Sequence, residues 1–196
     1  APLFTGPMFS KPQPELPAAF ADLSGKAFSV WAAGGGGHLV DGKSATEQFY
    51  LAAQQLASAE QPAVLISGTN FNAQLPATDY VRVVKALPNA ELMTLLQQAS
   101  LVVSGGGDMM GQAIVLGKNT VAVPVAKDQP DRVLACAAEG LIYPATLATA
   151  DIVAQCQKAL RTPLVSVYSS EPGLQLVLAD IASLLALPAP AASEGI

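Results

Sequence analysis

The stretch Phe28-Ser-Val-Trp-Ala-Ala-Gly-Gly-Gly-Gly37 decides the fold. Its first six residues are mostly apolar and show no regular alternation with polar residues, which is typical of a strand buried on both faces of a parallel sheet. Four consecutive glycines follow, and a helical pattern starts at about Ser44, where Ser44-Ala-Thr-Glu47 matches a capping box. We therefore expect a unit of strand, glycine loop and helix.

The same alternation continues along the chain. Further strands are expected at residues 63–67, 80–84, 101–104 and 120–123, with a short edge strand at 141–143. Helices are expected at residues 89–98, 108–116, 129–139, 150–161 and 173–187. Strands and helices that alternate in this way predict a doubly wound parallel sheet, a Rossmann-like α/β fold with right-handed crossovers.

Proline content and hydrophobic periodicity predict how the chain is divided into linker, domain and tail. We expect residues 1–26 to form a proline-rich linker, residues 27–187 to form a single α/β domain, and residues 188–196 to be an unstructured tail. With 51% hydrophobic and 13% charged residues among 196, the composition is that of a compact domain with a sizeable core.

Charge and composition exclude several classes of function. The formal net charge is −5, so no basic surface is expected for binding nucleic acid. The sequence shows neither a run of apolar residues long enough to span a membrane nor a signal peptide, and we expect a cytoplasmic protein. Cys136 and Cys156 are the only cysteines and His38 is the only histidine, so neither a disulfide framework nor a metal site is expected.

Two glycine clusters follow the first and the fourth expected strands, at residues 34–37 and 105–107. In an open α/β sheet, ligands bind at the carboxyl ends of the strands where the strand order reverses. Glycine lets backbone N–H groups approach a ligand closely, and helix N-termini attract anions. The clusters therefore predict a diphosphate site, although tight strand-to-helix turns remain the alternative interpretation.

An alternative site overlaps the first cluster. Residues Gly37-His-Leu-Val-Asp-Gly-Lys-Ser44 match the P-loop pattern G-x-x-x-x-G-K-S, which would make the chain a nucleotide hydrolase or kinase that uses Lys43 and Ser44. Three extra glycines before Gly37, and strands that do not end in an aspartate to hold Mg²⁺, argue against this hypothesis without removing it. The segment also lacks the third glycine of a nicotinamide-binding fingerprint.

Taken in order, the segments resemble the C-terminal half of a two-domain GT-B glycosyltransferase, most closely the MurG-like enzymes of glycosyltransferase family 28. The motifs that carry the resemblance are Thr5-Gly-Pro7, Val30-Trp-Ala-Ala-Gly-Gly-Gly-Gly37, Ala99-Ser-Leu-Val-Val-Ser-Gly-Gly-Gly107, Leu116-Gly-Lys-Asn-Thr-Val-Ala-Val-Pro124 and Asp128-Gln129. The resemblance runs from about Thr5 to Leu160.

The resemblance implies an enzyme that transfers a hexosyl group from a UDP-sugar donor, with no further cofactor. The acceptor would be held by an N-terminal domain or a partner subunit, so the isolated chain is expected to be inactive and its catalytic base is unassigned. A homodimer formed through an exposed apolar face, and membrane association through the other domain, are further expectations.

The resemblance also implies a set of donor-site residues. The backbone at Leu87 would meet the uracil, and Met109 and Gln112 stand where the family has a hydroxyl residue and a ribose-binding glutamate. Asp128 and Gln129 match an acidic-plus-amide pair for the donor sugar. The residues expected to face the diphosphate are Gly35, Gly36, Gly37, His38, Gly105, Gly106 and Gly107.

Three assignments keep an alternative interpretation. Asp108 is expected to be the N-cap of the helix after the second glycine cluster, where its charge would repel a diphosphate. Asp128 is expected either to bind the donor sugar or to cap the helix at Gln129. Because Met109 and Gln112 depart from the family pattern, a degenerate nucleotide-binding module without catalysis is also left open.

Overall fold

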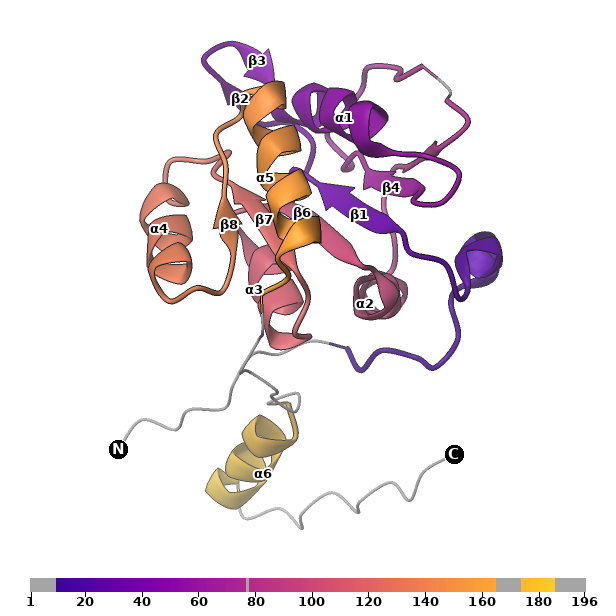
Figure 1. Cartoon of the computed structure of the whole chain (residues 1–196). Helices are drawn as coiled ribbons and strands as arrows, with labels where there is room; N and C mark the ends of the chain where they lie inside the picture. Colours follow the sequence, from indigo (N-terminus) through magenta and orange to yellow (C-terminus); the bar gives the residue numbers. More distant parts are fainter. Residues whose placement is uncertain (1–9, 77, 165–173, 186–196) are drawn as a thin grey trace.

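The centre of the molecule is a six-stranded parallel sheet with the strand order β5-β4-β1-β6-β7-β8 (Figure 1). The computed structural model describes residues 10–76, 78–164 and 174–185. The strands of the sheet are β1 (Ser29–Ala32), β4 (Ala63–Ile66), β5 (Val81–Val84), β6 (Leu101–Gly105), β7 (Thr120–Val123) and β8 (Tyr143–Pro144).

Burial explains why these segments form strands. Every residue of β1, β4, β6 and β7 is buried, as expected for strands covered on both faces. In β1, Val30 pairs with Val64 of β4 on one side and with Val102 of β6 on the other. The edge strand β5 is only partly buried, and its Val83 is 38% exposed.

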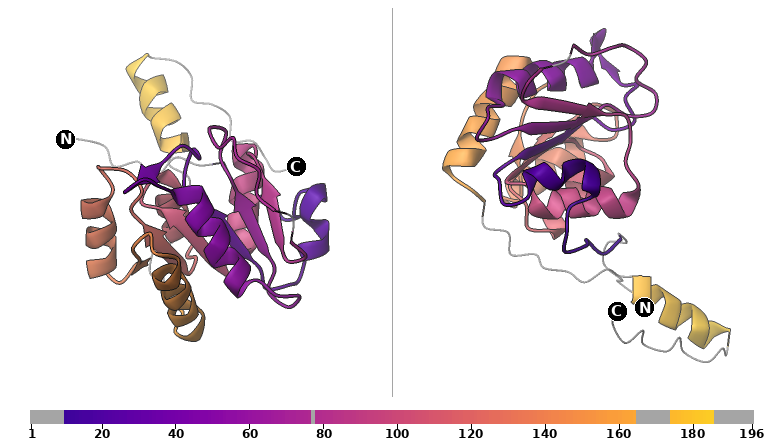
Figure 2. Two further views of the ribbon diagram at one scale, coloured as in Figure 1. Left: turned by 90° about the horizontal axis from the view of Figure 1, so that it is seen from above. Right: turned by 90° about the vertical axis from the view of Figure 1, so that its right-hand side faces the viewer.

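Helices cover both faces of the sheet (Figures 1 and 2). One face packs against α1 and α5 in a core that includes Trp31, Phe49 and Ile152. The other face packs against α2 and α3, with Met93 and Leu96 in the core. The helices are α1 (Ala45–Leu56), α2 (Asn89–Gln98), α3 (Asp108–Val115), α4 (Pro130–Ala138), α5 (Thr149–Arg161) and α6 (Leu174–Leu184).

The expected doubly wound α/β fold is confirmed. The strand boundaries differ from the expected ones by one or two residues, and Ser44 caps α1 by accepting a hydrogen bond from the backbone N–H of Glu47 at 3.3 Å. Short apolar runs of four to six residues, alternating with longer helical patterns, were sufficient to predict the architecture.

The segment expected to be a linker is folded from Ser10 onward. It contains a short 3-10 helix, η1 (Ala18–Leu23), whose Phe20 side chain is buried in the α2 face of the core. The backbone N–H of Ser10 donates to Asn89 Oδ1, and that of Gln13 donates to Thr94 Oγ1, so this stretch is fixed along α2. The motif Thr5-Gly-Pro7 lies outside the described residues.

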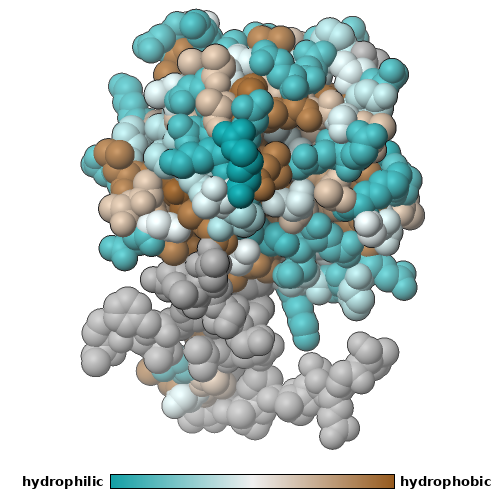
Figure 3. Space-filling view, viewed as in Figure 1, coloured by the Kyte–Doolittle hydropathy of each residue, from teal (hydrophilic) through white to brown (hydrophobic). Residues whose placement is uncertain are grey.

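Helix α6 lies apart from the sheet in Figures 1 and 2. Its Leu178, Ile181 and Leu184 are exposed. Elsewhere, on the face shown in Figure 3, hydrophobic residues gather in small patches separated by hydrophilic ones. None of the helices within the described residues combines the length and the apolar character needed to cross a membrane.

Candidate functional site

A small crevice of about 200 Å³ lies at the carboxyl ends of β1 and β6. From β1 the chain crosses to β4 on one side, whereas β6 lies on the other side, so the crevice occupies the point where the strand order reverses. Its lining residues are Ala32, Ala33, Gly34, Ile66, Leu92, Gly105, Gly107, Asp108, Met109 and Gln129.

The N-terminus of α3 forms one wall of this crevice. Gly107 is the N-cap residue, and within the described part of the chain this end of the helix has no side-chain cap. The first N–H groups of a helix have no acceptor within the helix, and they carry partial positive charge. This wall can therefore donate backbone hydrogen bonds to an anionic group.

Asp108 is not the N-cap that the sequence predicted. It is the first residue of α3, and its exposed side chain lines the crevice. Gly107 is the N-cap instead, and its backbone is extended (φ −95°, ψ −152°) between the end of β6 and the first helical residue. The N-terminus of α3 is thus left without a side-chain cap, but a carboxylate stands beside it.

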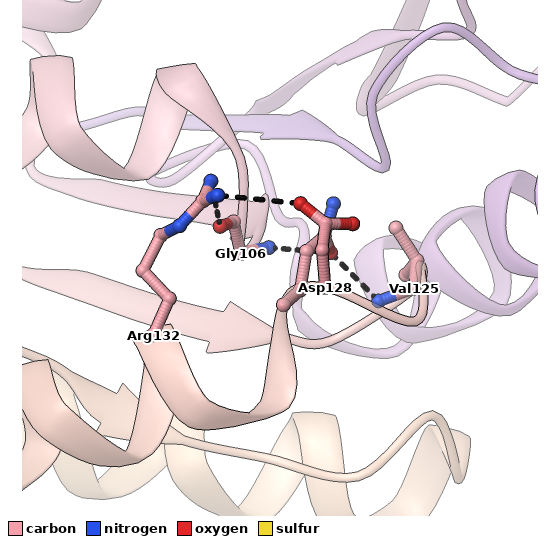
Figure 4. A network of polar contacts seen from close by, with 5 residues as sticks. Gly106, Val125, Asp128 and Arg132 are labelled. Carbon is pink, nitrogen blue, oxygen red and sulfur yellow. Dashed lines mark hydrogen bonds and ion pairs between the residues drawn. The ribbon is translucent and has the colours of Figure 1, made fainter.

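Gln129 holds the glycine loop after β6 in place through contacts with Gly106 and Val125, which are labelled in Figure 4. Its side-chain Oε1 accepts hydrogen bonds from the backbone N–H of Gly106 at 3.0 Å and of Val125 at 2.8 Å, and the residue is 8% exposed. This oxygen is therefore already engaged by two backbone groups. The remaining amide nitrogen lies 3.6 Å from the place where a Cβ would stand on Gly107.

Arg132 joins the same network from α4 (Figure 4). Its guanidinium donates to the backbone oxygen of Gly106 at 3.2 Å and pairs with the carboxylate of Asp128 at 3.2 Å. Asp128 is exposed and does not cap α4. Its structural role is thus an i,i+4 ion pair that orients a cation toward the glycine loop.

The glycines after β1 serve mainly to bring two loops together. A Cβ on Gly36, which has φ +91°, would stand 2.4 Å from the backbone oxygen of Ser67. A Cβ on Gly68, which has φ +87°, would stand 2.3 Å from the backbone carbon of Gly35. At Gly36 the room that the missing side chain leaves is filled by Ser67 and Phe71, so a glycine is required there by packing.

The P-loop hypothesis is wrong for the same segment. Leu39 and Val40 (β2) pair antiparallel with Lys43 and Ser44 (β3) in a hairpin. Both turn residues have positive φ, 50° at Asp41 and 75° at Gly42, as a two-residue hairpin turn requires. The segment is therefore a hairpin and not a loop wrapped around phosphates.

The crevice brings together only part of the predicted donor site. Gly105, Gly107, Met109 and Gln129 line it, whereas the other predicted residues do not: Gly35, Gly36, Gly37, His38, Leu87, Gly106, Gln112 and Asp128. Leu87 packs against the α2 face of the core, and Gln112 is half-buried farther along α3. Gly106 is buried behind the crevice, held by Gln129 and Arg132.

The sequence motifs did not identify the apolar residues that line the crevice, nor the cation Arg132. Ile66 lies at the end of β4, which pairs with β1 in the sheet. Arg132 follows Asp128 by four residues, which is the spacing of a helical ion pair. The hydroxyl of Ser104, directly before the glycine loop, is buried without a hydrogen-bond partner among the described residues.

In the described part of the chain, no three His, Cys, Asp or Glu side chains lie close enough together to hold a metal ion.

The same fold occurs in enzymes that handle sugars. The chain superposes on the glycotransferase of kitacinnamycin with a TM-score of 0.62, at 19% identity over 82% of this chain and 41% of the other. For CalG4, the calicheamicin glycosyltransferase, the TM-score is 0.63 at 18% identity, with 82% of this chain and 39% of the other covered. The chain thus spans about two fifths of the length of these two structures.

A second class of enzyme is equally similar in structure. UDP-GlcNAc 2-epimerase from Neisseria meningitidis, bound to UDP-GlcNAc, has a TM-score of 0.63 at 14% identity, covering 86% of this chain and 47% of the other. No protein-family profile and no curated protein sequence matches this chain. The likeness shows the fold, and the MurG-like family in particular stays a prediction.

Proposed function

We propose that the chain is the donor-binding part of a glycosyltransferase and that the crevice at β1 and β6 takes the diphosphate end of a UDP-sugar. The observation that carries the proposal is the N-terminus of α3, which faces the crevice without a side-chain cap and follows a loop of three glycines. Backbone N–H groups at such a helix end suit a diphosphate in the absence of a metal ion.

The network behind the loop supports this role. Gln129 and Arg132 fix the backbone of Gly106 from two sides, so the N–H groups next to it would need little ordering when a ligand binds. The amide nitrogen of Gln129 is the group at the crevice that could meet a hydroxyl of the donor sugar.

A second candidate is a UDP-sugar epimerase, and the observation that favours it is the equal TM-score of the Neisseria enzyme. Both candidates share the nucleotide-sugar site and differ in what happens to the sugar. In either case we expect the rest of the active site to come from another domain or subunit, because the chain spans less than half of these structures.

Calorimetric titration of the chain with UDP, in EDTA and again with Mg²⁺, tests the proposal. We expect UDP to bind equally well with and without the metal, and more tightly than ADP. Gly107→Ala adds a methyl group to the crevice wall where the nearest atom is 3.6 Å away, so it should weaken UDP binding about tenfold without disturbing the fold.

The matched control is Gly111→Ala, on the same helix, where an added Cβ would have open space around it. It should leave UDP binding unchanged. Absence of UDP binding, or equal weakening by both variants, would contradict the proposal. Gln112→Glu tests the ribose assignment separately, since a carboxylate there should tighten UDP binding if the side chain meets the ribose hydroxyls.

A further inference from the structure

A second and larger cavity, of about 890 Å³, lies beside the crevice at the same edge of the sheet. The β2–β3 hairpin forms one side with His38, Leu39 and Lys43, and the loops after β7 and β8 form the other with Lys127 and Leu147. We call this cavity the hairpin groove. None of the motifs in the sequence predicted it, because the hairpin itself was expected to be a helix entrance or a phosphate loop.

The hairpin groove and the crevice share a wall. His38 lines the groove, and its Nε2 lies 3.2 Å from the place where a Cβ would stand on Gly34, which lines the crevice. On the other side of this wall, Gln129 of the crevice binds the backbone N–H of Val125, which lines the groove. A molecule in the groove would therefore lie next to a donor in the crevice.

The chemistry of the groove differs from that of a nucleotide site. Its lining is mainly apolar, and Leu39 is 68% exposed on the hairpin. Leu39 extends this apolar lining to the rim of the groove. Such a lining has few groups to pair with the phosphates and hydroxyls of a UDP-sugar.

The charged groups at the groove favour an anion. Lys43 and Lys127 line it together with Asp41, although the whole chain has a formal net charge of −5. Asp151 of α5 lies next to the groove residue Thr146, and its carboxylate accepts hydrogen bonds from the backbone N–H and the hydroxyl of that threonine, both at 2.7 Å. The two lysines are left as cations beside an apolar surface.

We propose that the hairpin groove binds the acceptor, and that this acceptor is an apolar molecule carrying a carboxylate. The proposal rests on the proposed function, because it assigns the groove by its position next to the donor crevice. The apolar body would lie against Leu39 and Leu147, and the carboxylate would meet Lys43 and Lys127. The second domain of the complete protein would close the groove from outside.

A titration followed by NMR on ¹⁵N-labelled chain tests this inference, with 2-naphthoate as the probe and naphthalene-2-carboxamide as its neutral counterpart. We expect naphthoate to shift the amide signals of Leu39, Lys127 and Leu147 and to bind about threefold or more tightly than the carboxamide, as a partly screened ion pair allows. Naphthoate and UDP should bind together without displacing each other.

Two pairs of variants separate the contributions of charge and apolar contact. Lys127→Gln should bring naphthoate affinity down to that of the carboxamide, whereas Lys85→Gln, an exposed lysine after β5 at the far edge of the sheet, should change neither. Leu39→Ser should weaken both probes, whereas Leu134→Ser, 62% exposed on α4, should weaken neither.

The outcomes distinguish this inference from the proposed function. UDP binding without naphthoate binding, displacement of naphthoate by UDP, or equal binding of both probes would overturn the groove assignment alone. Naphthoate binding without any UDP binding would overturn the proposed function and the acceptor assignment with it.

Discussion

Gln129 and Gly106 are joined by a hydrogen bond of 3.0 Å, from the backbone N–H of the glycine to the side-chain oxygen of the glutamine. The two residues come from loops that follow different strands, β6 and β7. Because the same oxygen also binds Val125, one buried amide fixes both loops at the edge where the crevice lies. The shape of the crevice therefore depends on the side chain of Gln129, for which the family resemblance implied a contact with the donor sugar.

Gln129→Leu should lower the free energy of unfolding by about 2–4 kcal/mol, because it leaves two buried N–H groups without an acceptor. Urea denaturation measures this loss. Gln129→Glu keeps the acceptor oxygens and should cost less, and Gln54→Leu on the exposed face of α1 should cost almost nothing. A loss for Gln129→Leu no larger than that of Gln54→Leu would contradict the assigned role.

Substitution by alanine should lower the free energy of unfolding at Gly106 but leave it almost unchanged at Gly107. A Cβ on Gly106 would stand 2.6 Å from Val133 Cγ2, so Gly106→Ala should destabilise the protein by about 1–3 kcal/mol. Gly107→Ala meets only ordinary contacts and should unfold at nearly the same urea concentration as the parent chain. Equal midpoints for the two variants would show that the loop is not packed as described.

The carboxyl group of Asp151 should make the free energy of unfolding depend on pH. Hydrogen bonds from Thr146 hold the pKa of this carboxyl below its ordinary value of 3.8. A lowered pKa in the folded state contributes stability that is present above pH of about 4 and is lost as the pH falls through the folded value. Asp151→Ala should therefore cost about 1 kcal/mol at pH 7, after allowance for solvent screening, and less near pH 2.

The measurement for Asp151 is urea denaturation of both chains at the two pH values. Asp131→Ala is the matched control, an exposed carboxylate in the first turn of α4. A cost for Asp151→Ala that is the same at both pH values would exclude the hydrogen bonds as its cause.

The contacts of Arg82 should stabilise η1 against local unfolding. Its guanidinium donates to both carboxylate oxygens of Asp22, at 3.0 and 2.8 Å, and to the backbone oxygen of Ala19 at 2.6 Å. Arg82→Leu should therefore speed hydrogen exchange in η1 while leaving exchange in β6 unchanged. Unchanged exchange in η1 would mean that burial of Phe20 and Leu23 alone fixes this helix.

The sequence was sufficient for the sheet and less informative about the loops. Strands such as residues 101–104 consist mainly of apolar residues, which indicates burial on both faces. The parallel sheet could therefore be predicted. The pair Asp41-Gly42 between Leu39-Val40 and Lys43-Ser44 is a hairpin signal that the P-loop pattern concealed. That signal was present in the sequence and would have identified the hairpin.

Other features depend on contacts between residues distant in sequence. The space that Gly36 leaves is filled by Ser67 and Phe71, and the oxygen of Gln129 is taken by Gly106. Whether a glycine makes room for a ligand or for another loop is decided only when the chain has folded. For this reason the sequence could place the crevice at the correct edge of the sheet but could not say which glycines line it.

The most direct test of the central claim is the change in amide NMR signals when UDP is added to the chain in EDTA. The account predicts the largest shifts at Gly107, Asp108 and Met109, around the N-terminus of α3, and little change in the hairpin at residues 41–44. Saturating UDP without any shift at α3, or shifts confined to the hairpin and dependent on Mg-ATP, would contradict it.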